Sequence, residues 1–224
     1  MSSNENLKVT QKQQRGIRLT ITAIVVFIVV VMLLFLNKIL TPRHLSPIEL
    51  QVHGAIEFEQ PRRFKDFTLV DQHNQPFERS RLEGKWSLVF FGFTHCPDIC
   101  PTTMATLAQW YDGLPEKLRE QTQVILVTVD PARDTPAVLA EYVPYFHQDF
   151  IGVTGEFLPI KRFATQLNVA FTKVVQGDSY TMDHSGHVAL VNAKGDFHGF
   201  FKAPLQPDNL TLTYSSMVNN FPFD

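Results

Sequence analysis

Residues 86–101 read W-S-L-V-F-F-G-F-T-H-C-P-D-I-C-P and contain both cysteines of the chain, Cys96 and Cys100. The first half of this stretch, 86–93, is a continuous apolar run of strand length, which is typical of a strand buried on both faces. The cysteines follow where this strand ends and a helix is predicted to begin. Four residues apart on a helix, their Cα atoms would lie roughly 6 Å apart on one face. That separation is compatible with a disulfide bond and also with two sulfurs on one metal ion.

The segments around this stretch are predicted to alternate between strands and helices. Before it, 66–70 and 76–77 flank a polar turn and predict a small hairpin. After it, the pattern predicts a helix at 102–118, a strand at 124–129, a helix capped by Thr135, a strand at 150–153, a helix at 156–167, hairpin strands at 188–192 and 197–201, and a last helix opened by Pro207. The early strand–helix–strand order requires parallel strands, whereas the final hairpin adds an antiparallel pair. This order predicts an α/β sandwich of the thioredoxin-like class with a mixed sheet.

A long apolar segment precedes this domain. Residues 19–36 are eighteen residues without a charged side chain, and as a helix they would be about 27 Å long, close to the roughly 30 Å hydrocarbon core of a bilayer. A cleaved signal peptide is the rival interpretation, but no small-residue cleavage site follows the run, so we expect an uncleaved anchor. Four basic residues precede the segment and two follow it, which places the N-terminus in the cytoplasm. We therefore expect a bacterial inner-membrane protein with a single pass and a periplasmic main domain.

These features divide the chain into four expected parts. They are a cytoplasmic tail at 1–18, a transmembrane anchor at 19–40, a polar tether at 41–62 and the thioredoxin-like domain at 63–224. Because the two cysteines lie in the outer domain, we expect them to be exposed to an oxidising compartment.

The charge of the main domain excludes one class of partner. The first 44 residues carry six of the 20 basic and one of the 22 acidic side chains, which leaves 14 basic and 21 acidic side chains for the remainder. A phosphate backbone rewards clustered lysine and arginine, so an acidic body of this kind is unsuited to it. Nucleic-acid binding is therefore not expected.

The pair of thiols admits several kinds of chemistry. Two inert buried cysteines or a purely structural disulfide would account for it, but the position between strand and helix and the loop prolines Pro97 and Pro101 favour a functional pair. A helix N-terminus makes thiolates more available, whereas the charge of Asp98 opposes this effect. Thiolates are soft ligands that select Cu(I), zinc or iron–sulfur clusters. A structural zinc site needs four protein ligands and the sequence has no second cysteine pair, whereas Cu(I) accepts two or three ligands.

A third ligand for Cu(I) would be a histidine or methionine that the fold brings near. In a thioredoxin-like sandwich the loop before the C-terminal hairpin approaches the cysteine loop, and that loop, 181–187, reads T-M-D-H-S-G-H. His184 is therefore the first candidate. His187 and His95 are weaker candidates.

Five further side chains have two possible roles. Met104 and Met182 are soft enough to assist copper, although methionine at helical spacing is typical of a core. Asp130, Arg133 and Asp134 lie between the strand at 124–129 and the helix capped by Thr135. They form either a surface turn with a helix-capping carboxylate or a loop that acts directly at the cysteine site.

Three blocks of sequence resemble the SCO/SenC family, the assembly proteins for the copper centre of cytochrome c oxidase. They are F-G-F-T-H-C-P-D-I-C-P-T-T, V-T-V-D-P-A-R-D-T-P, and D-H-S at 183–185. The resemblance covers most of 64–220, and the anchor and tether are also similar to that family. It implies a copper site made of Cys96, Cys100 and His184 that binds Cu(I) and also Cu(II).

The resemblance also implies a function. It is that of a membrane-anchored copper chaperone, rather than a turnover enzyme, which delivers copper to the binuclear site in the copper-binding subunit of the oxidase. Other copper chaperones and thioredoxin-like reductants are further expected partners. The alternative is a thiol–disulfide oxidoreductase that uses Cys96 and Cys100 as a redox-active pair and keeps the cysteines of the oxidase copper site reduced. A third hypothesis, a peroxidase with Arg133 as activator of one cysteine, fits the cysteine spacing poorly.

Overall fold

The computed structural model describes residues 11–40, 44–219 and 221 of the 224-residue chain. The first ten residues of the expected cytoplasmic tail lie outside this description, as do residues 41–43 of the expected tether. The chain forms two compact units that divide after Arg43.

The first unit contains one long helix, α1 (Gln11–Leu40). Within it, Gln14–Lys38 is long and apolar enough to cross a membrane. The side chains of this apolar segment are exposed, and such a surface suits lipid.

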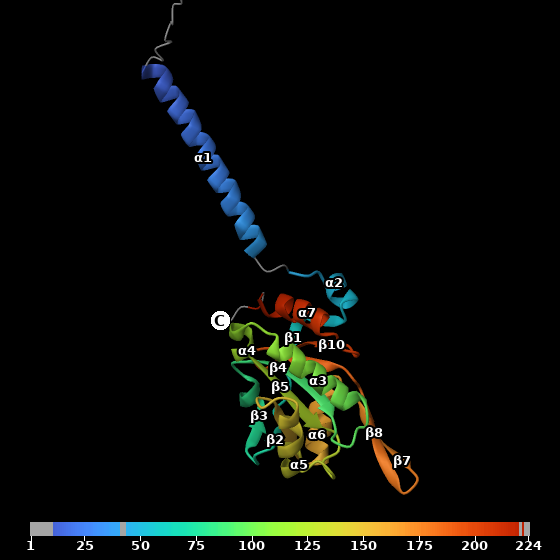
Figure 1. Ribbon diagram of the computed structural model, residues 1–224. Coiled ribbons are helices and arrows are strands. Elements are labelled where there is room, and N and C mark those ends of the chain that lie inside the picture. Colours follow the sequence, from blue (N-terminus) through green and yellow to red (C-terminus); the bar gives the residue numbers. More distant parts are fainter. Residues whose placement is uncertain (1–10, 41–43, 220, 222–224) are drawn as a thin grey trace, which may run out of the picture. The chain divides into compact units, whose positions relative to one another are not determined.

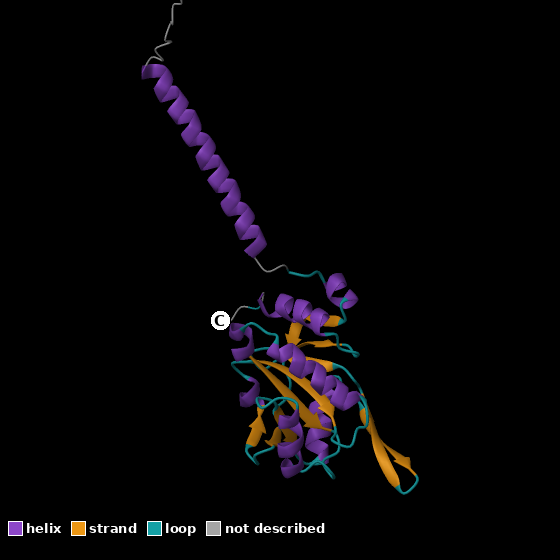
Figure 2. Ribbon diagram, in the orientation of Figure 1, coloured by secondary structure: helices purple, strands orange, loops and turns teal. Residues whose placement is uncertain are grey.

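The second unit is built on a mixed eight-stranded sheet (Figure 2). In spatial order its strands are β1 (Ala55–Arg62), β10 (Phe197–Phe201), β9 (Val188–Val191), β4 (Trp86–Gly92), β5 (Thr122–Thr128), β6 (Ile151–Thr154), β2 (Thr68–Asp71) and β3 (Pro76–Glu78). Strands β4, β5 and β6 run parallel, whereas the other neighbours pair antiparallel. Every residue of β4 is buried, which confirms the prediction of a strand covered on both faces. The α/β fold class with a mixed sheet is likewise confirmed.

Helices cover both faces of this sheet. They are α2 (Pro47–Val52), α3 (Ile99–Asp112), α4 (Glu116–Glu120), α5 (Pro136–Tyr142), α6 (Phe157–Gln166) and α7 (Pro207–Asn219), with short 3-10 helices at Arg79–Leu82 and Val143–Tyr145. Successive side chains of a strand point to opposite faces. On β4, Phe90 lies on the side of Cys100 and α3, whereas the ring of Phe91 contacts Phe163 of α6. The sheet therefore lies between α3, which packs beside α7, and α6.

A separate hairpin extends from this body (Figure 1). It consists of β7 (Phe171–Gln176) and β8 (Ser179–His184), which pair antiparallel over their whole length. The turn contains Gly177 with a φ of 59°, a left-handed backbone that glycine adopts at little cost. No hairpin was predicted at 171–184, although the last residue of this hairpin is His184, the first candidate for the third ligand.

The predicted helix at 102–118 is two helices. Helix α3 begins at Ile99 and ends at Asp112, and α4 begins after Pro115. Proline disfavours a helical backbone at the preceding residue and has no N–H to donate, so one continuous helix cannot pass through Pro115. Because α3 begins at Ile99, Cys96 lies in the loop before the helix and only Cys100 lies in its first turn. The separation considered for two cysteines on one helix therefore does not apply to this pair.

The stretch 41–62, expected as a tether, contains regular structure from Pro47 onward. The hydroxyl of Ser46 accepts a hydrogen bond from the backbone N–H of Glu49, and the Glu49 carboxylate accepts one from the N–H of Ser46. This reciprocal capping box starts α2. Strand β1 follows and pairs with β10 at the edge of the sheet. Residues 47–62 are therefore part of the folded unit rather than of a tether.

Candidate metal centre

Cys96 and Cys100 lie where the chain passes from β4 to α3. Both are free thiols, and both are buried. The N–H of Cys100 donates to the Sγ atom of Cys96 over 3.4 Å, which holds that sulfur at the helix N-terminus. Gly92 makes room for the other sulfur, because a Cβ atom at this position would lie 3.1 Å from the Sγ atom of Cys100. The chain that follows β4 thus places the two sulfurs side by side in a buried site.

His184 reaches the same position from the end of β8. Its Nε2 atom lies 3.5 Å from the Sγ atom of Cys100, across 84 positions of sequence. Its Nδ1 atom lies 3.1 Å from the carbonyl oxygen of Ser185 and donates to it, so Nε2 keeps a lone pair directed at the sulfur. The rings of Phe90 and Phe93 stand edge-on to the imidazole, with centroids 5.9 and 6.0 Å away. The histidine is therefore oriented as a ligand within an apolar wall.

The separations in this cluster fit one small ion. The ligand atoms of Cys96, Cys100 and His184 all lie within 4.8 Å of one another. A trigonal ion with metal–sulfur bonds of about 2.3 Å and a metal–nitrogen bond of about 2.0 Å requires roughly 4.0 Å between the sulfurs and roughly 3.7 Å between sulfur and nitrogen. Two sulfurs and one imidazole, with no carboxylate, make a donor set for a soft ion such as Cu(I).

Burial controls the protonation of these ligands. Burial raises the pKa of the Cys100 thiol well above its ordinary value, and its hydrogen bond with Cys96 adds to the rise. Burial lowers the pKa of His184, against the opposing effects of the Ser185 carbonyl and the Asp183 charge. At neutral pH the imidazole is therefore neutral, and the Cys100 thiol keeps a proton that an incoming metal must displace.

The weaker predicted ligands lie outside this cluster. The Nε2 atom of His187 lies 3.2 Å from the carbonyl oxygen of Leu167, and His95 is exposed to solvent. Met104 and Met182 are buried in the hydrophobic core, as methionines at regular spacing usually are.

Asp134 holds the loop that carries Cys96. Its carboxylate has no exposed surface and accepts hydrogen bonds from the Thr94 N–H (3.0 Å), the Thr94 hydroxyl (2.6 Å) and the Thr128 hydroxyl (2.6 Å). The N-cap of α5 is instead Thr135, as predicted, because its hydroxyl accepts a hydrogen bond from the backbone N–H of Val138. Asp134 is therefore a buried acceptor that joins the loop before Cys96 to the end of β5.

Asp130, Arg133 and Tyr180 form a second connection, which we call the latch. The Tyr180 hydroxyl donates to the Asp130 carboxylate over 2.9 Å, and the Arg133 guanidinium forms an ion pair with the same carboxylate. Arg133 also donates to the Tyr180 carbonyl oxygen over 3.3 Å and lies 3.9 Å from the centroid of its ring. Tyr180 is on β8, so the latch fastens the strand that ends in His184 to the loop after β5. Sequence reasoning missed Tyr180, because only an alternating S-Y-T-M pattern pointed to a strand there.

Comparison with known proteins shows that this chain has relatives. The family described as SCO1/SenC matches residues 57–219. A protein of Stutzerimonas stutzeri, provisionally named as copper-binding, is 41% identical over 160 residues, which are 71% of this chain and 78% of that protein. The SCO2-like protein of Rickettsia felis is 37% identical over 148 residues, 65% of this chain and 72% of its own length. The mitochondrial protein SCO2 of Saccharomyces cerevisiae is 39% identical over 150 residues, 66% of this chain and 48% of its own length.

Two solved structures, both with copper bound, have the same fold. ScoI of Arabidopsis thaliana superposes with a TM-score of 0.65 at 33% identity, over 70% of this chain and 98% of that chain. Yeast Sco1 superposes with a TM-score of 0.66 at 32% identity, over 73% of this chain and 92% of that chain. The residues that match the family, 57–219, lie within the second unit.

Proposed function

The chain belongs to the SCO1/SenC family, and from this membership and the geometry of its ligands we propose that it is a copper chaperone for cytochrome c oxidase. Copper is held by Cys96, Cys100 and His184 and is delivered to the binuclear site of the copper-binding subunit during oxidase assembly. Copper is the cargo of this protein, which is therefore not a turnover enzyme.

The observation that carries this proposal is the approach of His184 Nε2 to the Sγ atom of Cys100, at 3.5 Å. It converts a dithiol into a three-ligand set of the size that a copper ion requires. Cu(I) is satisfied by two thiolates and one imidazole, and a further ligand or water would complete the coordination of Cu(II). Because few ligands hold the ion, thiolates of a partner can replace them one at a time.

Helix α1 supports a location at the membrane. We infer a single-pass inner-membrane protein with a cytoplasmic N-terminus and the second unit in the periplasm, from the apolar run and the basic residues before it. A cleaved signal sequence would have a similar helix. Mass spectrometry of the mature protein separates these two cases, because an uncleaved anchor retains Gln14–Lys38.

A copper titration tests the ligand set. Reduced protein is titrated with Cu(I) against a chromophoric competitor, with Cys96→Ser, Cys100→Ser and His184→Ala measured beside the wild type. We expect one copper per chain and a loss of affinity of more than roughly tenfold in each variant, since even the loss of a residue that only orients a ligand costs about that much. His187→Ala is the matched control and should keep the wild-type affinity. A His184→Ala protein with undiminished affinity would refute the three-ligand site.

Thiol–disulfide exchange is the second candidate function, because the two thiols are free and adjacent. Fast exchange with the cysteines of the oxidase subunit or with a thioredoxin-like reductant, together with negligible copper binding, would favour it over copper delivery. Peroxidase activity has no comparable support, because Arg133 is bound to Asp130 and Tyr180 in the latch.

A further inference from the structure

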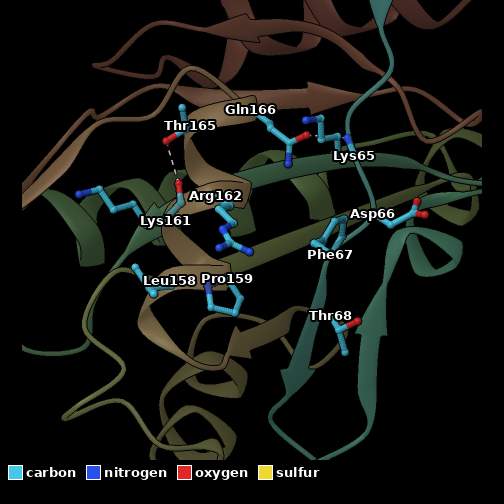
Figure 3. A pocket seen from close by; sticks show the side chains of 10 residues that line it. All are labelled: Lys65, Asp66, Phe67, Thr68, Leu158, Pro159, Lys161, Arg162, Thr165 and Gln166. Carbon is cyan, nitrogen blue, oxygen red and sulfur yellow. Dashed lines mark hydrogen bonds between the residues drawn. The ribbon is translucent and has the colours of Figure 1, made fainter.

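A basic hollow lies between α6 and the segment that leads into β2. We call it the basic pocket; its volume is about 900 Å³, and its lining includes Lys65 and Phe67 on one wall and Lys161 and Arg162 on the other (Figure 3). The backbone N–H of Lys65 donates to the side-chain oxygen of Gln166 on α6. This bond ties the two walls together, so the pocket is a feature of the folded unit rather than a gap between loose segments.

The positive charge of the basic pocket is not neutralised from within the protein. Lys65, Lys161 and Arg162 are exposed, and none of them forms an ion pair with a carboxylate in the described part of the chain. Asp66 is the single acidic side chain in the lining. Beyond residue 44 the protein carries 14 basic and 21 acidic side chains, so the pocket reverses the charge of its surroundings. A reversal of this kind attracts acidic partners and repels basic ones.

The basic pocket also presents apolar surface. Leu158, at the first turn of α6, is 61% exposed, and Pro159 lies next to it. Figure 3 places both on the α6 wall, with Phe67 on the other wall. Cations around an exposed leucine fit an acidic peptide segment that carries an apolar side chain better than they fit an inorganic anion.

Two smaller hollows continue from the basic pocket to the metal centre. The first, of about 290 Å³, shares Lys161 and Thr165 with the basic pocket. The second, of about 330 Å³, shares Ala170 and Phe171 with the first, and its lining also includes Asp183 and His184. Each hollow shares lining residues with the next, so the three are neighbours, and we call them together the track.

We propose that the track is the docking surface for the protein that exchanges copper with this chain, and that an acidic segment of that partner occupies the basic pocket. This inference rests on the proposed copper-delivery function and names the chemistry of its partner. Docking raises the effective concentration of the partner's ligands at His184. Cu(I) then leaves the sulfurs of Cys96 and Cys100, which take up two protons, and binds two thiols of the partner, which release two. No electron is transferred.

The test uses the full chain in nanodiscs and two synthetic copper acceptors. Both acceptors carry the same two-cysteine sequence and the same glycine–serine linker, but one ends in a tail of glutamates and phenylalanines and the other in a tail of lysines and phenylalanines. We expect Cu(I) transfer to the acidic acceptor to be at least roughly tenfold faster at low salt, and the difference to shrink at high salt. Lys161→Glu with Arg162→Glu should reverse the preference. Lys85→Glu with Lys117→Glu, two exposed cations outside the track, should preserve it.

The outcomes separate the docking surface from the function on which it rests. If the Lys161→Glu/Arg162→Glu protein binds copper normally and keeps the preference for the acidic acceptor, the docking surface is refuted and copper binding stands. If the wild type binds no copper, the proposed function fails, while fluorescence anisotropy of a labelled acidic tail on the metal-free protein still tests the pocket. If phosphatidylglycerol nanodiscs protect Lys161 from an amine-reactive label and the acidic tail does not, the pocket belongs to a membrane surface and the proposal is refuted.

Discussion

Replacing Asp134 by alanine should destabilise the protein and loosen the metal centre. The side chain accepts three hydrogen bonds without any exposed surface, from the Thr94 N–H and from the hydroxyls of Thr94 and Thr128. A hydrogen bond to a charged group contributes about 1.5–3 kcal/mol, and the removal of a buried charge returns part of that sum. We expect Asp134→Ala to lower the free energy of unfolding by about 3–5 kcal/mol, because it leaves these donors without an acceptor.

Asp134→Asn is the matched control, because asparagine has the same shape. Its amide oxygen can accept from the Thr94 N–H and the Thr128 hydroxyl, which both bind Oδ2, and its NH₂ group can donate to the Thr94 hydroxyl, which binds Oδ1. The expected loss is therefore below about 1.5 kcal/mol. The contrast between alanine and asparagine measures the hydrogen bonds rather than the volume of the side chain.

Urea unfolding of the reduced, metal-free unit 44–224 measures both variants. Residues 44–224 form a separate compact unit that contains the whole family match, 57–219, so we expect the unit to fold without α1. With a dependence of about 2 kcal/mol per molar urea, Asp134→Ala should move the midpoint by roughly 1.5–2.5 M. The copper affinity of the alanine variant should fall as well, since Thr94 leads into Cys96. A loss of less than about 1 kcal/mol, or equal losses for alanine and asparagine, would refute the role of the carboxylate.

Three further results are expected. Tyr180→Phe removes the hydrogen bond to the charged Asp130 carboxylate, worth about 1.5 kcal/mol, and should weaken copper binding roughly tenfold. Tyr145→Phe, which changes an exposed tyrosine, should leave the affinity unchanged, and equal affinities of the two variants would contradict the latch. Burial lowers the pKa of His184 and that of His187, so the unfolded chain binds more protons, and the metal-free protein should lose stability as the pH falls through about 6.5. A urea midpoint that does not change between pH 7.5 and 5.5, or one that changes with pH equally in His184→Gln, would count against this. Burial raises the pKa of the Cys100 thiol, so copper binding should release its proton, and the copper affinity should increase with pH. Calorimetry in buffers of different ionisation enthalpy measures the released proton, and the absence of proton release would contradict this.

The centre of the fold was predictable because the amino-acid composition of its strands identifies them. Strands β4 and β5 are buried on both faces and are therefore nearly continuous apolar runs, which need no tertiary information to be identified. Thr135 followed by Pro136 gave the start of α5 for a local reason, the hydroxyl cap. The resemblance nominated Cys96, Cys100 and His184, and the structure brings these residues together. Their role as copper ligands remains a prediction.

The parts that were missed have no clear local pattern in the sequence. In β7 nearly every side chain is exposed, so the segment has neither the apolar run of a buried strand nor a clear alternation. Tyr180 and Asp130 meet across 50 positions, and no local pattern encodes that pairing. Asp134 looked like a capping carboxylate because it stands one residue before a true cap. Its burial follows from the packing of the loop against the end of β5, which only the folded chain defines.

The division of the expected ligands between two kinds of element suits the copper delivery that we propose. The sulfurs lie at the junction of a fully buried strand and a core helix, where movement would disturb the packing of the whole unit. The imidazole lies at the end of a hairpin that forms its own two-stranded sheet and is fastened to the body by the latch. Elements with few buried contacts open at a lower free energy than the core does. In the delivery that we propose, release of the histidine before the thiolates would require only local opening, and the two sulfurs would hold the ion until a ligand of the partner replaced them.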